Sequence, residues 1–267
     1  MSVMETHNSL AGLRRLARGA VLPVLIGLGW WALLAFHWAD ERIVASIGQV
    51  IACGIRWVTT GAIWIDAGSS LARNIVGFSL GALAGIAAGV ALSLSALARK
   101  LVLPSINALK QVSIFAWVPL ISVWFGLGEA SRIFFIAFSV FFPVLFNTAE
   151  GIASVPSELL EVARVFRFSR WQAVRRIVWP AVLPSVFTGL YVGLVMSWMV
   201  TLGAEYMLTA THGVGYLLLD GRENFRMDQV ILGVIVVGLI GFGVHAVADT
   251  AERRLLRWRG TSPMVEI

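Results

Sequence analysis

Six long stretches of this chain contain no Asp, Glu, Lys or Arg and consist mostly of apolar residues. They are Gly19–Ala39, Asn74–Ala98, Gln111–Gly128, Ile133–Ala149, Ile177–Ala204 and Gln229–Ala248. A bilayer core of about 30 Å is crossed by about 20 apolar residues in a helix, which satisfies its own backbone hydrogen bonds. The run from Gln111 is short, but it extends past Lys110 to Leu101. The pattern therefore predicts an all-α, polytopic membrane protein with six transmembrane helices.

Two shorter apolar segments differ from these runs. Between residues 43 and 58 apolar residues recur near a helical period, which predicts a helix that lies along the outer surface. Tyr206–Leu219 is only fourteen residues long and is interrupted by Gly213 and Gly215. Its length favours a re-entrant or interfacial piece over a complete span.

The main polar interruption lies at 151–183, between the fourth and fifth runs. Pro156 suits a first helical turn, where its missing N–H costs nothing. Glu158 and Glu161 follow in the early turns, where the helix dipole favours negative charge. The small Ala163 permits close approach of whatever packs there. This part of the segment is expected to form one short helix in water beside the membrane.

A second short helix is expected from Ser169, because Gln172 stands three residues later in a capping-box arrangement. The two helices would join at a bend near Arg167. Pro180 and Pro184 are expected to close the segment before the fifth span.

The basic residues indicate the orientation. Most of them lie in the first 18 residues, at 99–100, in the 151–183 segment and in the C-terminal tail, so the positive-inside rule places these parts in the cytoplasm. We expect a cytoplasmic segment at 1–18, a single transmembrane domain at 19–250 and a basic cytoplasmic tail at 251–267. The run Gly19–Ala39 is longer than the apolar part of a signal peptide and lacks a small-x-small cleavage site, so we expect it to be retained.

Composition narrows the chemistry. Apolar residues make up 58% and charged residues 13%, and the net charge of +6 is explained by orientation rather than by nucleic-acid binding. The single cysteine, Cys53, excludes an internal disulfide, and the scattered histidines form no metal triad. Neither Lys100 nor Lys110 stands in a Walker A loop. We therefore expect no catalytic residue, cofactor or metal, and no enzymatic activity in this chain alone.

Small residues four apart form two stripes, which are Gly77, Gly81, Gly85 and Gly89 in the second run and Ser185, Gly189, Gly193 and Ser197 in the fifth. Such stripes let helix backbones approach closely in a membrane. We expect this packing within one protomer, with a subunit interface or a moving contact as the alternative.

Charged groups at membrane depth are candidates for function. Arg73, Lys110 and Glu205 are the candidate pathway residues, and an Arg73–Lys110 lining would favour anions. The alternatives are that Lys110 extends to the cytoplasmic face and that Glu205 pairs with Arg73.

The 151–183 segment resembles the coupling loop of permease subunits of binding-protein-dependent ABC importers. Glu161, Ala163, Ile177 and Pro180 match its motif, although Arg167 replaces the motif glycine, Trp179 a leucine and Val162 an alanine. Further short sequence segments resemble segments of permeases for nitrate, taurine and aliphatic sulfonates. They are Ala116-Trp-Val-Pro-Leu120, Trp124-Phe-Gly-Leu-Gly128, Phe142-Pro143, Asn147-Thr148 and Gly213-Val-Gly215.

The resemblance implies a type I importer permease that couples to separate ATP-binding cassette subunits. It also implies an external solute-binding protein and a second permease copy, in a bacterial inner membrane. The residues that it assigns to ATPase coupling are Glu158, Glu161, Ala163, Arg164, Arg167, Ser169, Arg170, Trp171, Ile177 and Pro180. Glu161 leads this set, with a solvated residue that complements the helix dipole as the alternative.

The implied solute is small and anionic, and a thiamine or riboflavin precursor is the alternative. From other classes, an ion-gradient secondary transporter would need inverted repeats with carboxylates at mid-membrane depth. A membrane-embedded enzyme would need a polar catalytic constellation, and a scaffold would transport nothing. A neighbouring gene for a Walker A ATPase would separate the importer from all three.

Overall fold

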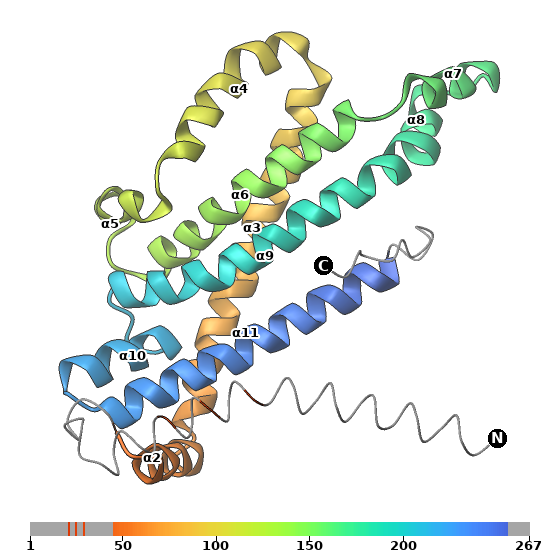
Figure 1. Ribbon diagram of the computed structural model, residues 1–267. Helices are drawn as coiled ribbons and strands as arrows, with labels where there is room; N and C mark the ends of the chain where they lie inside the picture. Colours follow the sequence, from red (N-terminus) through yellow and green to blue (C-terminus); the bar gives the residue numbers. More distant parts are fainter. Residues whose placement is uncertain (1–20, 22–24, 26–28, 30–44, 256–267) are drawn as a thin grey trace, which may run out of the picture.

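The computed structural model describes residues 45–255 together with Val21, Leu25 and Gly29. The predicted first span and most of the terminal segments lie outside these residues. All regular elements of the described part are helical (Figure 1). They are α2 (Ile47–Thr59), α3 (Ala62–Leu94), α4 (Ala96–Gln111), η1 (Ile114–Trp117), α5 (Val118–Phe125), α6 (Glu129–Ala153), α7 (Ser157–Val165), α8 (Arg170–Ala173), the π-helical η2 (Val174–Val178), α9 (Trp179–Met207), α10 (Val214–Glu223) and α11 (Met227–Leu255).

Helices α3, α6 and α9 form the core of the bundle, with α6 packed against both of the others. The glycines of α3 face α6 so closely that a Cβ at Gly77 would lie 2.7 Å from the Cβ of Ile136. On α9, a Cβ at Gly189 would lie 2.8 Å from the Cβ of Asn147, which also belongs to α6. Backbones without side chains gain dispersion contacts that lipid does not supply. The prediction that both stripes pack within one protomer is confirmed.

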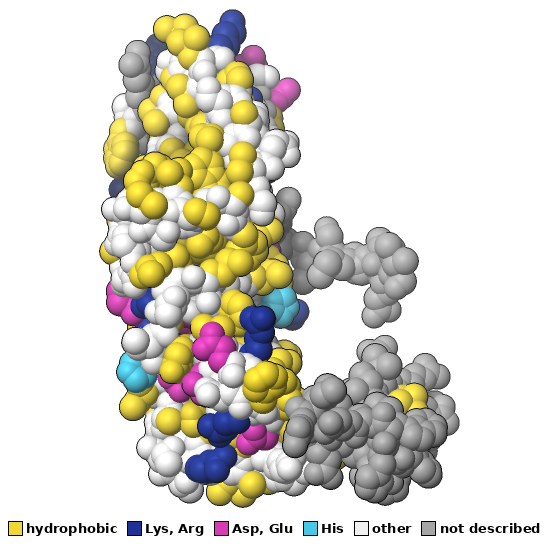
Figure 2. Space-filling model, turned by 90° about the vertical axis from the view of Figure 1, so that its left-hand side faces the viewer, with side chains coloured by type: hydrophobic (Ala, Val, Ile, Leu, Met, Phe, Trp, Pro, Cys, Tyr) yellow, Lys and Arg dark blue, Asp and Glu magenta, His cyan; other side chains and the backbone are white. Residues whose placement is uncertain are grey.

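Four single helices of the described part are long and apolar enough to cross a membrane. They are Ala62–Leu94, Glu129–Ala153, Trp171–Met207 and Met227–Arg254. A fifth crossing is possible through a pair of helices, Leu97–Gln111 and Ile114–Phe125, that are bent by 96°. Figure 2 shows one face, where a largely apolar band separates charged side chains at the two ends of the bundle. These spans and the all-helical fold agree with a polytopic membrane protein.

The expectation of one continuous helix through Leu101–Gly128 is wrong. The helix ends at Gln111 because Val112 has an extended backbone, with ψ of 127°. A short 3₁₀ turn then leads into α5, where Pro119 stands in the first turn and donates no N–H. The third apolar run is therefore broken in the middle.

Two further boundaries differ from the expectation. Helix α3 begins at Ala62 rather than near Asn74, where the predicted run starts, so Arg73 is a buried residue within the helix. Pro180 and Pro184 do not close the 151–183 segment, because the chain stays helical from α8 through η2 into α9. Pro180 is the second residue of α9, in the first turn after the π-helical residues, where a missing N–H is tolerated.

Short helices stand where short apolar segments were predicted. Helix α2 begins at Ile47, and its N-cap residue, Ser46, forms a capping box with Gln49. Helix α10 follows α9 after a connector at 208–213, and it packs against α11 and α9. Neither helix is long enough to span a bilayer.

Candidate functional site

The loop between α6 and α9 forms two short helices joined by a left-handed turn at Arg167. Its φ angle is 50°, and the N–H groups of Arg167 and Phe168 donate to the carbonyls of Arg164 and Ala163. This is the hydrogen-bond pattern of a Schellman motif, in which glycine is the usual left-handed residue. The predicted bend is confirmed, and Arg167 adopts it in place of the motif glycine at a cost of roughly 1–2 kcal/mol.

The second helix of the loop starts as predicted. The Ser169 N–H donates to Gln172 Oε1 at 2.9 Å, and the Gln172 N–H donates to Ser169 Oγ at 3.3 Å. These two bonds complete a capping box and satisfy two of the orphan donors at the helix start. Helix α8 then begins at Arg170.

The loop presents mixed apolar and charged side chains to its surroundings. Helices α7 and α8 with the bend between them form an elbow. Ala163 is buried in this elbow, whereas Glu158 and Glu161 are exposed. Large apolar side chains are also exposed there, including Phe166 and Trp171 at 68% and 72%. Arg164 and Arg167 are exposed, Ile177 is half-buried and Pro180 is exposed. A single protomer therefore carries an uncovered amphiphilic surface at this end of the bundle.

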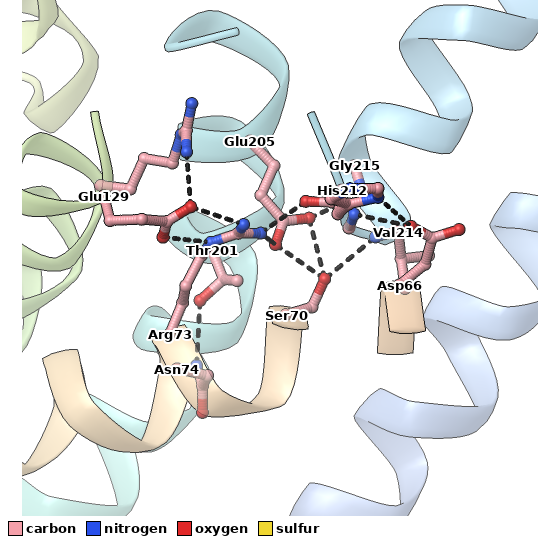
Figure 3. A network of polar contacts seen from close by, with 12 residues as sticks. Asp66, Ser70, Arg73, Asn74, Glu129, Thr201, Glu205, His212, Val214 and Gly215 are labelled. Atoms are coloured by element: carbon pink, nitrogen blue, oxygen red, sulfur yellow. Dashed lines mark hydrogen bonds and ion pairs between the residues drawn. The ribbon is translucent and has the colours of Figure 1, made fainter. Parts of the chain in front are cut away.

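At the opposite end, a stripe of buried polar side chains continues the glycine face of α3 (Figure 3). Its members are Asp66, Ser70, Arg73 and Asn74. Asn74 donates to Ser197 Oγ and Thr201 Oγ1 of α9, at 2.9 and 3.1 Å. Residues four apart lie on the same side of a helix, so one face of α3 is small near its middle and polar near its start.

The N-terminus of α10 is held by side chains from the core. The first N–H groups of a helix have no partner within it. In this protein three of them donate to three different side chains of α3 and α9. The bonds join Gly213 N–H to Asp66 Oδ1 (3.0 Å), Val214 N–H to Ser70 Oγ (2.9 Å) and Gly215 N–H to Glu205 Oε2 (2.8 Å).

The carboxylate of Glu205 leaves no room for a side chain at Gly213 or Gly215, at the start of α10. Glu205 is fully buried and also accepts a hydrogen bond from the Ser70 hydroxyl at 2.7 Å. Gly213 has a φ of 138°, and a Cβ there would lie 2.5 Å from Glu205 Cδ. A Cβ at Gly215 would lie 2.7 Å from Glu205 Cβ. The backbone approaches the carboxylate at a distance that only glycine allows.

Arg73 links three parts of the molecule. Its Nε and Nη2 donate to the two carboxylate oxygens of Glu129 at 2.6 and 2.8 Å, which is a bidentate pair. Its Nη1 donates to Glu205 Oε1 at 2.8 Å and to the carbonyl of His212 at 2.7 Å. The alternative that Glu205 pairs with Arg73 is confirmed.

A second buried arginine, Arg132, shares Glu129 with Arg73. Its Nη1 donates to Glu129 Oε1 at 2.7 Å. Its Nη2 donates to the carbonyls of Leu208 and Thr209 at 3.0 and 2.7 Å, which fastens the connector after α9 to α6. Thr209 itself has a positive φ of 47°.

The third pathway candidate, Lys110, lies elsewhere. It stands in the last turn of α4, where its ammonium lies 4.7 Å from the centre of the Phe146 ring of α6. Arg73 and Glu205 are thus brought together, and Lys110 pairs with an aromatic ring instead.

Asp66, Ser70, Glu129 and Arg132 were not predicted as functional residues. A usable signal was present, because Asp66, Ser70 and Arg73 extend the glycine stripe at spacings of three or four. Within the described residues, no group of three or more His, Cys, Asp or Glu is placed to hold a metal ion.

The helical bundle with its membrane-spanning helices defines a multi-pass membrane protein. The chain belongs to the family described as the binding-protein-dependent transport system inner membrane component, which matches residues 80–257. It is therefore an inner-membrane permease of the ABC importer class, and the predicted family is confirmed.

Two relatives support this family, and a solved structure supports the fold. The putative aliphatic sulfonates transport permease protein SsuC of Bacillus subtilis (strain 168) is 30% identical over 244 residues, which cover 91% of this chain and 88% of that protein. The nitrate import permease protein NrtB of Leptolyngbya laminosa is 33% identical, covering 73% and 70%. The inward-facing MetNI methionine ABC transporter has a chain that is 19% identical with a TM-score of 0.53, covering 73% of this chain and 96% of that one. This last likeness supports the fold alone.

Proposed function

We propose that this chain forms the translocation path of an ATP-driven importer for a small anionic solute. It works with separate ATP-binding cassette subunits, an external solute-binding protein and a second copy of itself. The family description supports the binding protein, and the relatives named for sulfonates and nitrate support an anionic solute. One domain, at 19–250, carries the path, between a cytoplasmic segment at 1–18 and a cytoplasmic tail at 251–267.

The observation that carries this proposal is the uncovered elbow formed by α7 and α8. It joins two core helices, since α6 leads into it and α8 continues through η2 into α9 without a break. A force on the elbow therefore reaches the membrane-spanning helices directly. Exposed apolar side chains together with Glu158 and Glu161 fit a surface that a protein partner covers. ATP-driven closure of the ATPase pair would tilt α6 and α9 between inward-open and outward-open states.

A second copy would complete the path. None of the side chains described on α4 is buried, and Leu97 and Leu101 are each 67% exposed. The surrounding lipid and a second permease would both cover such apolar surface.

We also assign both termini and the 151–183 loop to the cytoplasm.

The first prediction tests the elbow. The Glu161→Lys variant should lower transport-stimulated ATP hydrolysis by at least about tenfold, because reversing a charge at a docked surface costs on the order of 1.4 kcal/mol or more. ATPase co-purification and hydrolysis in reconstituted vesicles are the measurements. Membrane insertion and dimer formation should be unchanged, since the Glu161 side chain is exposed and makes no hydrogen bond or ion pair within the described part of the chain.

The matched control is Glu223→Lys, the same charge reversal at an exposed residue of α10, at the other end of the bundle (Figure 1). It should leave ATPase binding intact. Normal coupling in the Glu161→Lys protein would exclude Glu161 from the ATPase contact.

A further inference from the structure

Two buried guanidinium groups converge on one carboxylate that is open to solvent. The side chains of Arg73 and Arg132 are 8% and 5% exposed, whereas the Glu129 side chain is 54% exposed. Glu129 receives three hydrogen bonds from them, at 2.6, 2.7 and 2.8 Å. The cationic groups are therefore fixed in the protein, and the anionic group stands on the solvent side.

The two arginines differ in how many acidic partners they have. Arg73 keeps a second carboxylate, the fully buried Glu205, on its other edge. The other contacts of Arg132 are neutral carbonyls, so Glu129 is its one acidic partner among the described residues. The Nε of Arg132 is buried and has no hydrogen-bond partner in the same part of the chain. This guanidinium has donor capacity that the described residues leave unused.

The N-terminus of α6 adds to the positive electrostatic potential around Glu129. Glu129 is the first residue of α6, and the N-cap, Gly128, offers no side-chain hydrogen bond to the helix. The N-terminus of a helix carries a partial positive charge and unpaired N–H groups, both of which attract anions. Two guanidinium groups and a helix N-terminus thus surround the position of one carboxylate.

We propose that Arg73 and Arg132 form a binding site for a monovalent oxyanion at this end of the bundle, and that Glu129 is a resident counterion which the incoming anion displaces. The proposal rests on the proposed import function, and it names the class of solute and its binding site. A carboxylate, a sulfonate, nitrate and bicarbonate each present two oxygens in the geometry that a guanidinium fork binds. Glu129 can turn into solvent because it is half-exposed, whereas Glu205 is enclosed by Ser70, Arg73 and Gly215.

The competing explanation is purely structural, and it predicts the opposite result. If the Glu129 contacts only hold α3 and α6 together, removing its charge weakens the protein and creates no anion affinity. If Glu129 occupies the site of an anion, removing its charge removes an internal competitor. The two explanations therefore differ in the sign of the change.

The test is anion binding to the purified full-length permease in lipid nanodiscs, without ATPase or binding protein. Titration calorimetry with sodium nitrate and with sodium methanesulfonate is compared for the unaltered protein, Glu129→Gln and the control Glu223→Gln. We expect at least about tenfold tighter binding for Glu129→Gln, loss of binding for the Arg132→Gln/Glu129→Gln double variant, and no change for Glu223→Gln.

Unchanged or weaker binding by a folded Glu129→Gln protein would overturn the proposal. Should Glu129→Gln fail to fold, Glu129→Asp serves instead, because its shorter carboxylate reaches the guanidinium groups less well. It should also bind nitrate more tightly, and equal or weaker binding would overturn the proposal. Import by the complete transporter is measured separately. ATP-driven uptake without the expected anion binding would reject this site alone, and binding without ATP-driven uptake would reject the proposed import function alone.

Discussion

Glu205 shows how one residue can organise a whole region. Its carboxylate is buried at the end of α9, and it binds donors from α3 and from the first turn of α10. A buried charge is tolerated only when it is paired and hydrogen-bonded. Arg73 supplies the opposite charge, and Ser70 and Gly215 supply the remaining donors. The fit of the glycine turn around Glu205 is therefore part of how the protein accommodates this charge.

At this scale we predict that Gly215→Ala destabilises the protein by about 1–3 kcal/mol, because a Cβ would lie 2.7 Å from Glu205 Cβ and overpack the turn. The thermal midpoint in detergent should fall by several degrees, at about 2–4 °C per kcal/mol. The control is Gly238→Ala in α11, where a Cβ would meet nothing within 4 Å. Equal midpoints for the two variants would contradict the enclosed geometry of Glu205.

Arg167 illustrates a different residue-scale effect. A left-handed conformation is unfavourable for a residue with a Cβ, yet the Schellman hydrogen bonds hold it there. The exposed side chain is available to a partner, and glycine would have offered the same bend without that side chain. We propose that Arg167 contributes to the ATPase contact at a modest cost in local stability.

At the scale of elements, the α3–α6 contact is the tightest feature of the bundle core. A Cβ at Gly85 would lie 2.8 Å from the carbonyl oxygen of Phe141 and 2.9 Å from Val144 Cβ. A backbone carbonyl cannot move aside as a flexible side chain can. The two helices therefore depend on residues without a side chain at this contact.

We predict that Gly85→Leu separates α3 from α6 and costs at least about 3 kcal/mol, because the added side chain has no free volume. Size-exclusion profiles and thermal unfolding of the detergent-solubilised protein would measure this loss. Gly68→Leu provides the control in the same helix, since Gly68 is exposed and a Cβ there meets nothing within 4 Å. A Gly85→Leu protein as stable as this control would show that the helices are not in such close contact.

The elbow is also best understood as an element. The π-helical turns of η2 connect α8 to α9, so the loop is not a flexible linker but the beginning of a long helix. Pro180 lies in the first turn of α9, two positions after the last π-helical residue, Val178. A rigid connection of this kind transmits displacement better than a hinge would.

At the scale of the whole molecule, two regions that contain charged side chains stand at opposite ends of an apolar bundle (Figures 1 and 2). One is the elbow of α7 and α8, and the other is the charged network at the starts of α3 and α6. In the proposed orientation the elbow faces the cytoplasm, where ATP is available, and the network faces the external binding protein.

We predict this orientation for a cysteine reporter assay in intact cells, with Cys53 first replaced by alanine. Asn224→Cys, in the exposed turn after α10, should react with a membrane-impermeant maleimide. Ser157→Cys, in the exposed first turn of α7, should react only after the membrane is permeabilised. Labelling of Ser157→Cys in intact cells would reverse the orientation and remove the elbow from the ATPase.

Local patterns in the sequence determined much of this protein. The lengths of the apolar runs predicted the described spans, because a helix crosses the bilayer core only where enough consecutive residues are apolar. The capping box at Ser169 and the bend at Arg167 followed from residues within a few positions of each other. The glycine spacing predicted close packing for the same reason. The third apolar run was predicted as one helix from its composition, but the chain breaks at Val112 within it. Pro180 and Pro184 were expected to end the 151–183 segment, but the chain stays helical from α8 into α9.

Tertiary structure alone decided the charged network. Arg73 and Glu205 stand 132 positions apart, and Asp66 meets the N–H of Gly213 across 147 positions. No local propensity encodes such a pairing, because it arises only when α3, α6 and α9 pack side by side. The sequence could mark Arg73 and Glu205 as costly charges in an apolar setting. Only the packed bundle shows that their cost is offset by each other, and that Glu129 and Arg132 complete the site.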